Sequence, residues 1–112
     1  MNSQQKGKRK EREIAKLISK KFEIDCKRTP CSGALDFKGD IISLSGIASE
    51  YHWEVKNQES LNIWKALDQA IRDCRPGKTP TVVFSKAFSE NFIALRFDDF
   101  LNMIKEIEDL RQ

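Results

Sequence analysis

Apolar side chains recur along this chain with two periods, one typical of helices and one typical of strands. Residues 5–22 have the helical period, and the positions away from the apolar face are mostly charged. The apolar face of this predicted helix consists of Ile14, Ala15, Leu17, Ile18 and Phe22. A helix at the start of the chain is therefore the first expected element.

Two further helices are predicted, over residues 61–74 and 98–111. The first of these has Ser60 as its predicted N-cap and Pro76-Gly77 after its end. Its apolar face consists of Leu61, Trp64, Leu67, Ala70 and Ile71. The last helix begins near Asp98 and Asp99, whose charges are favourable at a helix N-terminus. Its apolar positions, assigned to core or dimer packing, are Phe100, Met103, Ile104, Ile107 and Leu110.

The segments between the helices are typical of strands. They are residues 22–28, 40–46, 49–56, 79–85 and 90–97. The second and third, separated by a turn near Gly46, predict an antiparallel hairpin, and the apolar run 79–85 predicts a strand buried on both faces. The order helix, three strands, helix, two strands, helix predicts one α/β (α+β) domain over residues 1–112, with a mixed central sheet flanked by helices.

Charge is distributed unevenly along the chain. Residues 1–30 contain ten Lys or Arg and four Asp or Glu, a net charge of +6, whereas the remainder contains ten and thirteen, a net charge of −3. A basic N-terminal third indicates a polyanionic partner. A solvated helix face is the alternative explanation of a charge run by itself.

The cysteines and the hydropathy bound the cellular setting. Cys26, Cys31 and Cys74 are odd in number and have no CxxC spacing, which favours free thiols in a reducing cytosol over disulfides or zinc. No apolar run has the length of a membrane span, and the N-terminus lacks the apolar core of a secretory signal. A cytoplasmic protein without membrane association is expected.

Candidate chemistry lies in the predicted hairpin. Asp40 begins one strand, and Glu54 and Lys56 lie on one face of the next, with Trp53 and Val55 on the other face. Two carboxylates, supplemented by backbone carbonyls and water, suit a hard cation such as Mg²⁺. A lysine beside them can activate water or neutralise a phosphate, which together favour metal-assisted phosphodiester hydrolysis. An ordinary surface ion pair worth under about 1 kcal/mol is the alternative for Glu54 and Lys56 alone.

Helical spacing selects a third acid. Glu11 lies on the same side of the first helix as Ala15 and Ile18, so its carboxylate is predicted to point toward the sheet. Glu13 is predicted to lie on the solvent side. Asp36 competes with Asp40 as the first strand acid, but Asp40 is preferred because it starts an apolar strand.

An acid in an N-terminal helix, followed by an Asp and then Glu-x-Lys, resembles the PD-(D/E)xK nucleases. The sequences "KGKRKERE", "SGALDFKGDI", "EVKNQ" and "WKALDQA" are similar in order to those of small archaeal-type Holliday junction resolvases and their phage relatives. Gly39 stands where the superfamily name has Pro. The resemblance implies a restriction-endonuclease-like αβββαβ core and a homodimer that cuts branched DNA in recombination and repair. It is compatible with a phage-encoded protein acting in the host cell.

The resemblance also implies roles for individual residues. Asp40, Glu54 and the carbonyl of Val55 would hold Mg²⁺, for which Mn²⁺ can substitute, Lys56 would activate water or stabilise charge, and Glu11 would assist. The residues expected to contact DNA are Lys6, Lys8, Arg9, Lys10, Arg12, Arg28, Ser32, Gln58 and Gln69. Lys20, Lys21 and Lys27 would extend this surface, which contacts phosphates without reading sequence.

Other readings remain open at this stage. The substrate could instead be flap, nicked, mismatched or unmodified duplex DNA, because fold does not fix function. A non-catalytic DNA-binding accessory protein and an interaction module built on the last helix are further alternatives. His52 is expected to be a half-exposed strand residue without a ligand role, and Trp53 and Trp64 are expected to pack in the core or an interface.

Overall fold

The computed structural model describes residues 3–29, 40–42 and 44–112, with side chains described from Gln5 onward. The elements in chain order are α1 (Ser3–Phe22), β1 (Lys27–Arg28), β2 (Ile41–Ile42), the 3₁₀ helix η1 (Gly46–Glu50), β3 (Tyr51–Asn57), α2 (Ile63–Asp73), β4 (Thr79–Ser85), β5 (Phe92–Ala94) and α3 (Phe97–Leu110). Cys31, Ser32 and Asp36 lie outside the described residues.

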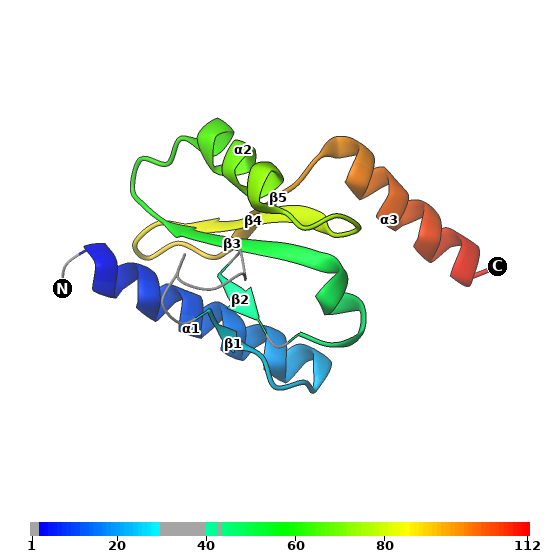
Figure 1. The fold of residues 1–112 in the computed structure, drawn as a ribbon, viewed down its shortest axis with the longest axis horizontal. Helices are drawn as coiled ribbons and strands as arrows, with labels where there is room; N and C mark the ends of the chain where they lie inside the picture. The colour runs from blue at the N-terminus through cyan, green and yellow to red at the C-terminus, as the bar shows by residue number, and fades with distance from the viewer. Residues whose placement is uncertain (1–2, 30–39, 43) are drawn as a thin grey trace.

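A mixed sheet forms the centre of the fold. Its strand order is β3-β4-β5, with β3 and β4 parallel and β4 and β5 antiparallel. Helix α1 lies on one face of the sheet and α2 on the other (Figure 1). The predicted α/β class with a mixed sheet flanked by helices is confirmed, and the architecture is consistent with a restriction-endonuclease-like core.

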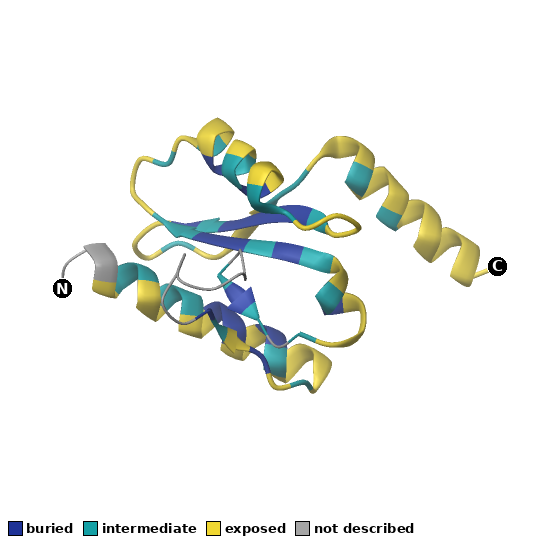
Figure 2. Ribbon diagram, viewed as in Figure 1, coloured by how far each residue is buried: buried dark blue, intermediate teal, exposed yellow. Residues whose placement is uncertain are grey.

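Buried residues lie on α1, on the central strands and on α2 (Figure 2), and alternation along the paired strands divides the apolar ones into two clusters. On the α1 side, Val55 and Val83 are opposite each other in the register and pack with Ile14 and Ile18. On the α2 side, Val82 packs with two alanines of that helix. Strand β4 is therefore buried on both faces, as its continuous apolar run predicts.

Several predicted boundaries and faces are wrong in detail. Leu17, Phe22 and Trp64 are exposed. The buried face of α1 consists of Ile14, Ala15 and Ile18, and that of α2 consists of Ala66 and Ala70. The N-cap of α2 is Asn62, whose Oδ1 accepts from the Lys65 amide at 3.1 Å, and not Ser60. The first and last strands are also shorter than predicted.

The predicted hairpin is replaced by a different arrangement. Strand β2 pairs antiparallel with β1, and η1 rather than a tight turn leads into β3. Two hydrogen bonds link Asp40, which precedes β2, to β3. Its amide donates to the Trp53 carbonyl at 2.8 Å, and its Oδ2 accepts from the Val55 amide at 2.6 Å. Trp53 itself packs against the α1-side cluster, as expected, and donates from Nε1 to the Ala48 carbonyl at 3.1 Å.

Helix α3 extends away from the sheet (Figure 1). It has the predicted bounds to within one residue, but none of its side chains is buried. The core-packing assignment of its apolar face is therefore wrong. Its exposed apolar side chains are Phe97, Phe100, Leu101, Ile104, Ile107 and Leu110.

The remaining structural expectations concern thiols and membranes. Cys26 and Cys74 are free, and Cys26 is buried with its Sγ donating to the Ala15 carbonyl at 3.1 Å. Within the described part of the chain, no helix is long and apolar enough to cross a membrane.

Candidate active site

Asp40 is held by three hydrogen bonds, two to the edge strand β3 and one to Thr29, which follows β1. Its amide donates to the Trp53 carbonyl and its carbonyl accepts from the Thr29 amide, both at 2.8 Å. Its carboxylate oxygen Oδ2 accepts from the Val55 amide at 2.6 Å. These contacts fix both the backbone and the side chain of Asp40 beside the segment that carries Glu54 and Lys56.

Glu54 and Lys56 lie on the α2 face of β3. Glu54 is opposite Val82, which packs under α2, and Lys56 Nζ donates to Gln69 Oε1 of α2 at 3.0 Å. Trp53 and Val55 lie on the α1 face, as the alternation predicts. The Glu-x-Lys pair is thus not an exposed surface pair, because Glu54 is buried and Lys56 is anchored by the neighbouring helix.

His52 lies next to Glu54, and its burial was predicted wrongly from the sequence. It is buried rather than half-exposed, and its Nε2 and Glu54 Oε1 are 2.9 Å apart, with side-chain exposures of 3 % and 4 %. An ionised carboxylate only accepts, so Nε2 is the donor in that state. The signal was present in the sequence, because residues two apart on a strand share a face.

Glu11 approaches the same acids from α1. Its side chain is partly buried, while Glu13 is exposed and pairs with Lys10 at 2.6 Å. Burial raises the pKa of Glu11, and the Glu54 charge acts in the same direction, whereas Arg28 lowers it. Glu11 is therefore close enough to Glu54 for their charges to interact, and it reaches β3 from the opposite face.

The acids are crowded enough to retain a proton. Burial, followed by the Glu54 charge, raises the pKa of Asp40 to about 8, against the opposing hydrogen bond from the Val55 amide. At neutral pH in the absence of a cation, Asp40 is mostly protonated. A divalent cation would replace that proton and remove the repulsion between Asp40 and Glu54.

The donor set fits a hard cation by its chemistry. Asp40 places a carboxylate oxygen at the backbone of Val55, the charge of Glu54 acts on Asp40, and Mg²⁺ prefers oxygen donors. Within the described ranges, no group of three or more His, Cys, Asp or Glu side chains is positioned to hold a metal. The ligand set proposed for a cation is therefore the carboxylates of Asp40 and Glu54 and the carbonyl of Val55, with water in the remaining positions.

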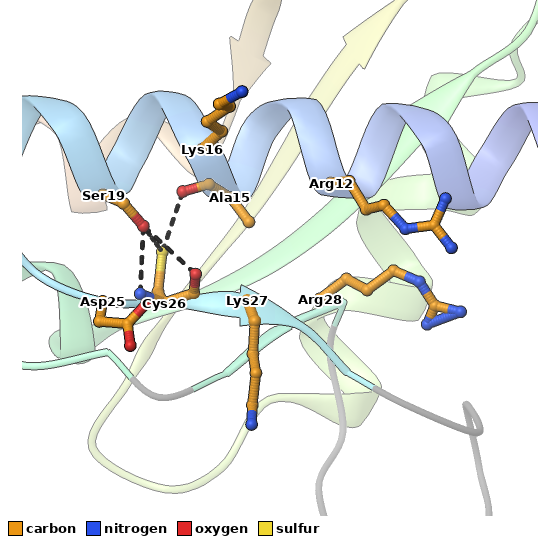
Figure 3. Close-up of a pocket in the computed structure, with 8 residues that line it drawn as sticks. All are labelled: Arg12, Ala15, Lys16, Ser19, Asp25, Cys26, Lys27 and Arg28. Atoms are coloured by element: carbon orange, nitrogen blue, oxygen red, sulfur yellow. Dashed lines mark hydrogen bonds between the residues drawn. The ribbon is translucent and has the colours of Figure 1, made fainter.

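The predicted basic residues line two pockets beside α1. The first has a volume of about 680 Å³, and Figure 3 shows Arg12 and Arg28 extending from α1 and β1 in the same direction. The second, of about 440 Å³, lies between the start of α1 and the segment after β4, and its lining includes Lys6, Arg9 and Lys10. Both pockets carry an excess of cations over acids.

The other predicted DNA contacts lie at different positions. Lys8 is exposed on α1, and Gln58 is exposed just after β3. Gln69 contacts Lys56, because its Oε1 accepts a hydrogen bond from Lys56 Nζ at 3.0 Å. Ser32 and the competing acid Asp36 fall outside the described residues.

A comparison with known families agrees with this geometry. A family model described as "Phage putative PDDEXK endonuclease" matches residues 2–111. Neither a curated protein nor a solved structure matches the chain. The resemblance to PD-(D/E)xK nucleases is confirmed at the level of the superfamily, and the resolvase branch stays a prediction. Because the match covers nearly the whole chain, this protein belongs to the phage family of PDDEXK endonucleases.

Proposed function

We propose that this protein is a Mg²⁺-dependent endonuclease that cleaves branched DNA as a homodimer, with the four-way junction as its leading substrate. The observation that carries the proposal is the position of Asp40. Its carboxylate accepts from the amide of Val55, the residue between Glu54 and Lys56, and burial and the Glu54 charge raise its pKa. Such a group of acids beside a lysine supports metal-assisted hydrolysis. A phage family and a DNA substrate favour action inside the infected cell.

Each residue has a part in this proposal. Asp40 and Glu54, with the carbonyl of Val55, would hold Mg²⁺ or Mn²⁺, which supplies an activated water and charge neutralisation when bound. Lys56, oriented by Gln69, stabilises charge developing on the phosphate as an ammonium, or accepts a proton from water as a neutral amine. Glu11 adds negative charge at the rim. Phosphates of the DNA lie along Arg12, Arg28 and the start of α1.

The substrate class is tested with a panel of labelled DNAs. A four-way junction, a flap, a nicked duplex, a duplex and a single strand are incubated with the protein in Mg²⁺ and in EDTA. Metal-dependent, symmetric cutting of the junction supports the proposal. Preferential cutting of another DNA in the panel would support a nuclease with that DNA as its substrate. Binding of these DNAs without cutting any of them would support the accessory-protein alternative.

His52 is expected to position Glu54. Removing its ring in His52→Leu leaves a buried carboxylate without its partner, so the cleavage rate should fall about 10- to 100-fold and the Mg²⁺ concentration for half-maximal rate should rise. His52→Gln keeps an amide donor and should recover much of the rate. Metal titrations of cleavage by the three proteins make the comparison. Equal Mg²⁺ requirements in all three would exclude the positioning role.

Glu11 and Glu13, both on α1, form a matched pair for testing whether the Glu11 carboxylate contributes to cleavage. Glu11→Gln is expected to lower the cleavage rate about tenfold, because it removes a carboxylate whose charge interacts with Glu54 and Lys56. Glu13→Gln removes an exposed partner of Lys10 in the lining of the 440 Å³ pocket, so it can change DNA affinity but should leave the rate at saturating protein unchanged. Single-turnover rates at fixed Mg²⁺ measure the difference, and equal rates for the two variants would remove Glu11 from the site.

The exposed apolar face of α3 is proposed to pack against a second copy. Its half-exposed Ile104 and Ile107 lie on a helix whose polar side carries the Lys105 ion pairs with Glu108 and Asp109. A two-fold dimer would bring two sites to a junction for paired cuts. Ile104→Asp is expected to give a monomer in sedimentation velocity, while Lys105→Ala stays dimeric. Identical sedimentation of wild type and Ile104→Asp would contradict this interface.

A further inference from the structure

The loop between β4 and β5, residues 86–91, holds an aromatic ring in an unusual position. Phe88 is fully exposed, at 108 % relative exposure, and has a φ of +61°. A bulky residue rarely adopts the left-handed region, and the strain persists only where the surroundings impose it. Neither burial nor an easy backbone conformation explains a phenylalanine at this position.

Hydrogen bonds fix this loop on both sides of Phe88. The Lys86 amide donates to Ser89 Oγ at 2.9 Å, and the hydroxyl lies 3.0 Å from the Lys86 carbonyl. The Ala87 amide donates to Glu59 Oε1 at 3.0 Å, which ties the loop to the segment after β3. The ring is therefore presented to solvent from a braced loop.

The pocket beside the ring has more cations than acids in its lining. Phe88 lines the 440 Å³ pocket together with Lys6, Arg9 and Lys10 of α1 and with Lys86, against the single acid Glu13. Asn57, which follows Lys56 directly on β3, lines the same pocket and accepts from Ser85 Oγ at 3.3 Å. The pocket thus joins an exposed aromatic ring and four cations at the end of β3 that carries Lys56.

We propose that Phe88 stacks on an unpaired base of bound DNA while the cations of this pocket contact the adjoining phosphates. An aromatic ring beside a basic groove is the combination that binds single-stranded nucleic acid. In a continuous duplex the base faces are covered by their neighbours, so a ring at this position favours DNA with uncovered base faces, exposed by unpairing at a fork or flap or by unstacking at the branch point of a junction. This inference rests on the proposed nuclease function and adds the feature by which its substrate is chosen.

Binding of two labelled DNAs in EDTA tests the inference without cleavage. The DNAs are a fork with unpaired arms and a continuous duplex of the same length, and the proteins are wild type, Phe88→Ala, Phe88→Trp and the control Ile47→Ala. Ile47 is exposed in η1, which precedes the opposite end of β3. Phe88→Ala is expected to weaken fork binding about tenfold and leave duplex binding unchanged. Phe88→Trp should keep the preference, with its indole fluorescence quenched by the fork alone, and Ile47→Ala should match wild type.

Equal affinity of Phe88→Ala and wild type for the fork would overturn the inference, as would an equal loss for fork and duplex. Cleavage in Mg²⁺ by wild type and by Asp40→Asn separates this result from the proposed function. If cleavage by wild type requires Asp40 but the preference for the fork does not depend on Phe88, the nuclease function is supported and the stacking role is excluded. Absence of DNA binding by wild type would overturn both.

Discussion

Replacing Asp40 with asparagine is expected to abolish metal-dependent cleavage while preserving the fold. The amide side chain has the same shape and can still accept from the Val55 amide, so the 2.6 Å contact that anchors β3 is retained. It removes the negative charge that a cation requires. We expect the cleavage rate to fall about a thousandfold, at the upper end of what removal of one electrostatic contributor produces.

The same substitution is expected to change how stability depends on pH. The pKa of Asp40 rises from an ordinary value of 3.8 to about 8 in the folded protein, so the folded state binds more protons between these values. The stabilisation from this proton is complete below pH 3.8 and is lost as pH rises through 8. Metal-free wild type should therefore lose stability from pH 5 to pH 9, by at most about 1.4 kcal/mol per pH unit.

Thermal unfolding in EDTA across this range checks the prediction. Asp40→Asn should show a flatter pH dependence and a higher Tm than wild type at pH 9, and Glu13→Gln should follow wild type. Added Mg²⁺ should raise the Tm of wild type at pH 8 and leave that of Asp40→Asn unchanged. A lower Tm of Asp40→Asn at every pH would mean that the substitution damages the fold and that its lost activity is uninformative.

Replacing Lys56 with methionine is expected to reduce the cleavage rate about a thousandfold, with DNA binding nearly intact. The methionine side chain retains the unbranched stem and removes the ammonium that Gln69 holds at 3.0 Å. Charge that develops on the phosphate would then lose the cation that Lys56 supplies. The rate under single-turnover conditions and the affinity in EDTA measure the two effects separately.

The arginine variant and a control distinguish the roles open to Lys56. Arginine remains charged at every working pH, so a stabilising role predicts that Lys56→Arg keeps substantial activity with an unchanged pH profile. A proton-accepting role predicts inactivity of the same variant. Lys65→Met, at an exposed position of α2, should behave as wild type. A Lys56→Met protein with wild-type cleavage would remove this residue from the mechanism.

Local periodicity in the sequence predicted the relative positions of several residues of the candidate site. Strand alternation predicted that Glu54 and Lys56 share a face opposite Trp53 and Val55, and helical spacing separated the partly buried Glu11 from the exposed Glu13. These features depend on residues close in the chain, whose relative directions follow from one element. The central apolar strand β4 was predictable for the same reason.

Features that depend on distant pairing were not predictable in this way. Strand β2 pairs with β1 across the chain, and Asp40 reaches β3 through two hydrogen bonds of its own, where a hairpin was expected. The burial of His52 follows from the sheet and α2 around it, which local pattern does not reveal. An apolar helix face looks the same in sequence whether it packs in the core or lies exposed, so the sequence could not exclude the core alternative for α3.

One measurement tests the central claim most directly: single-turnover cleavage started by adding Mg²⁺ to a preformed complex of the protein with an end-labelled four-way junction. Wild type is expected to cut opposite strands at matching positions, while Asp40→Asn binds with equal affinity and yields no product. A wild-type complex that binds the junction and releases no product in Mg²⁺ or Mn²⁺ would contradict the claim. Equal cutting by wild type and Asp40→Asn would also contradict the claim, because the catalytic site would then not include Asp40 at the edge of β3.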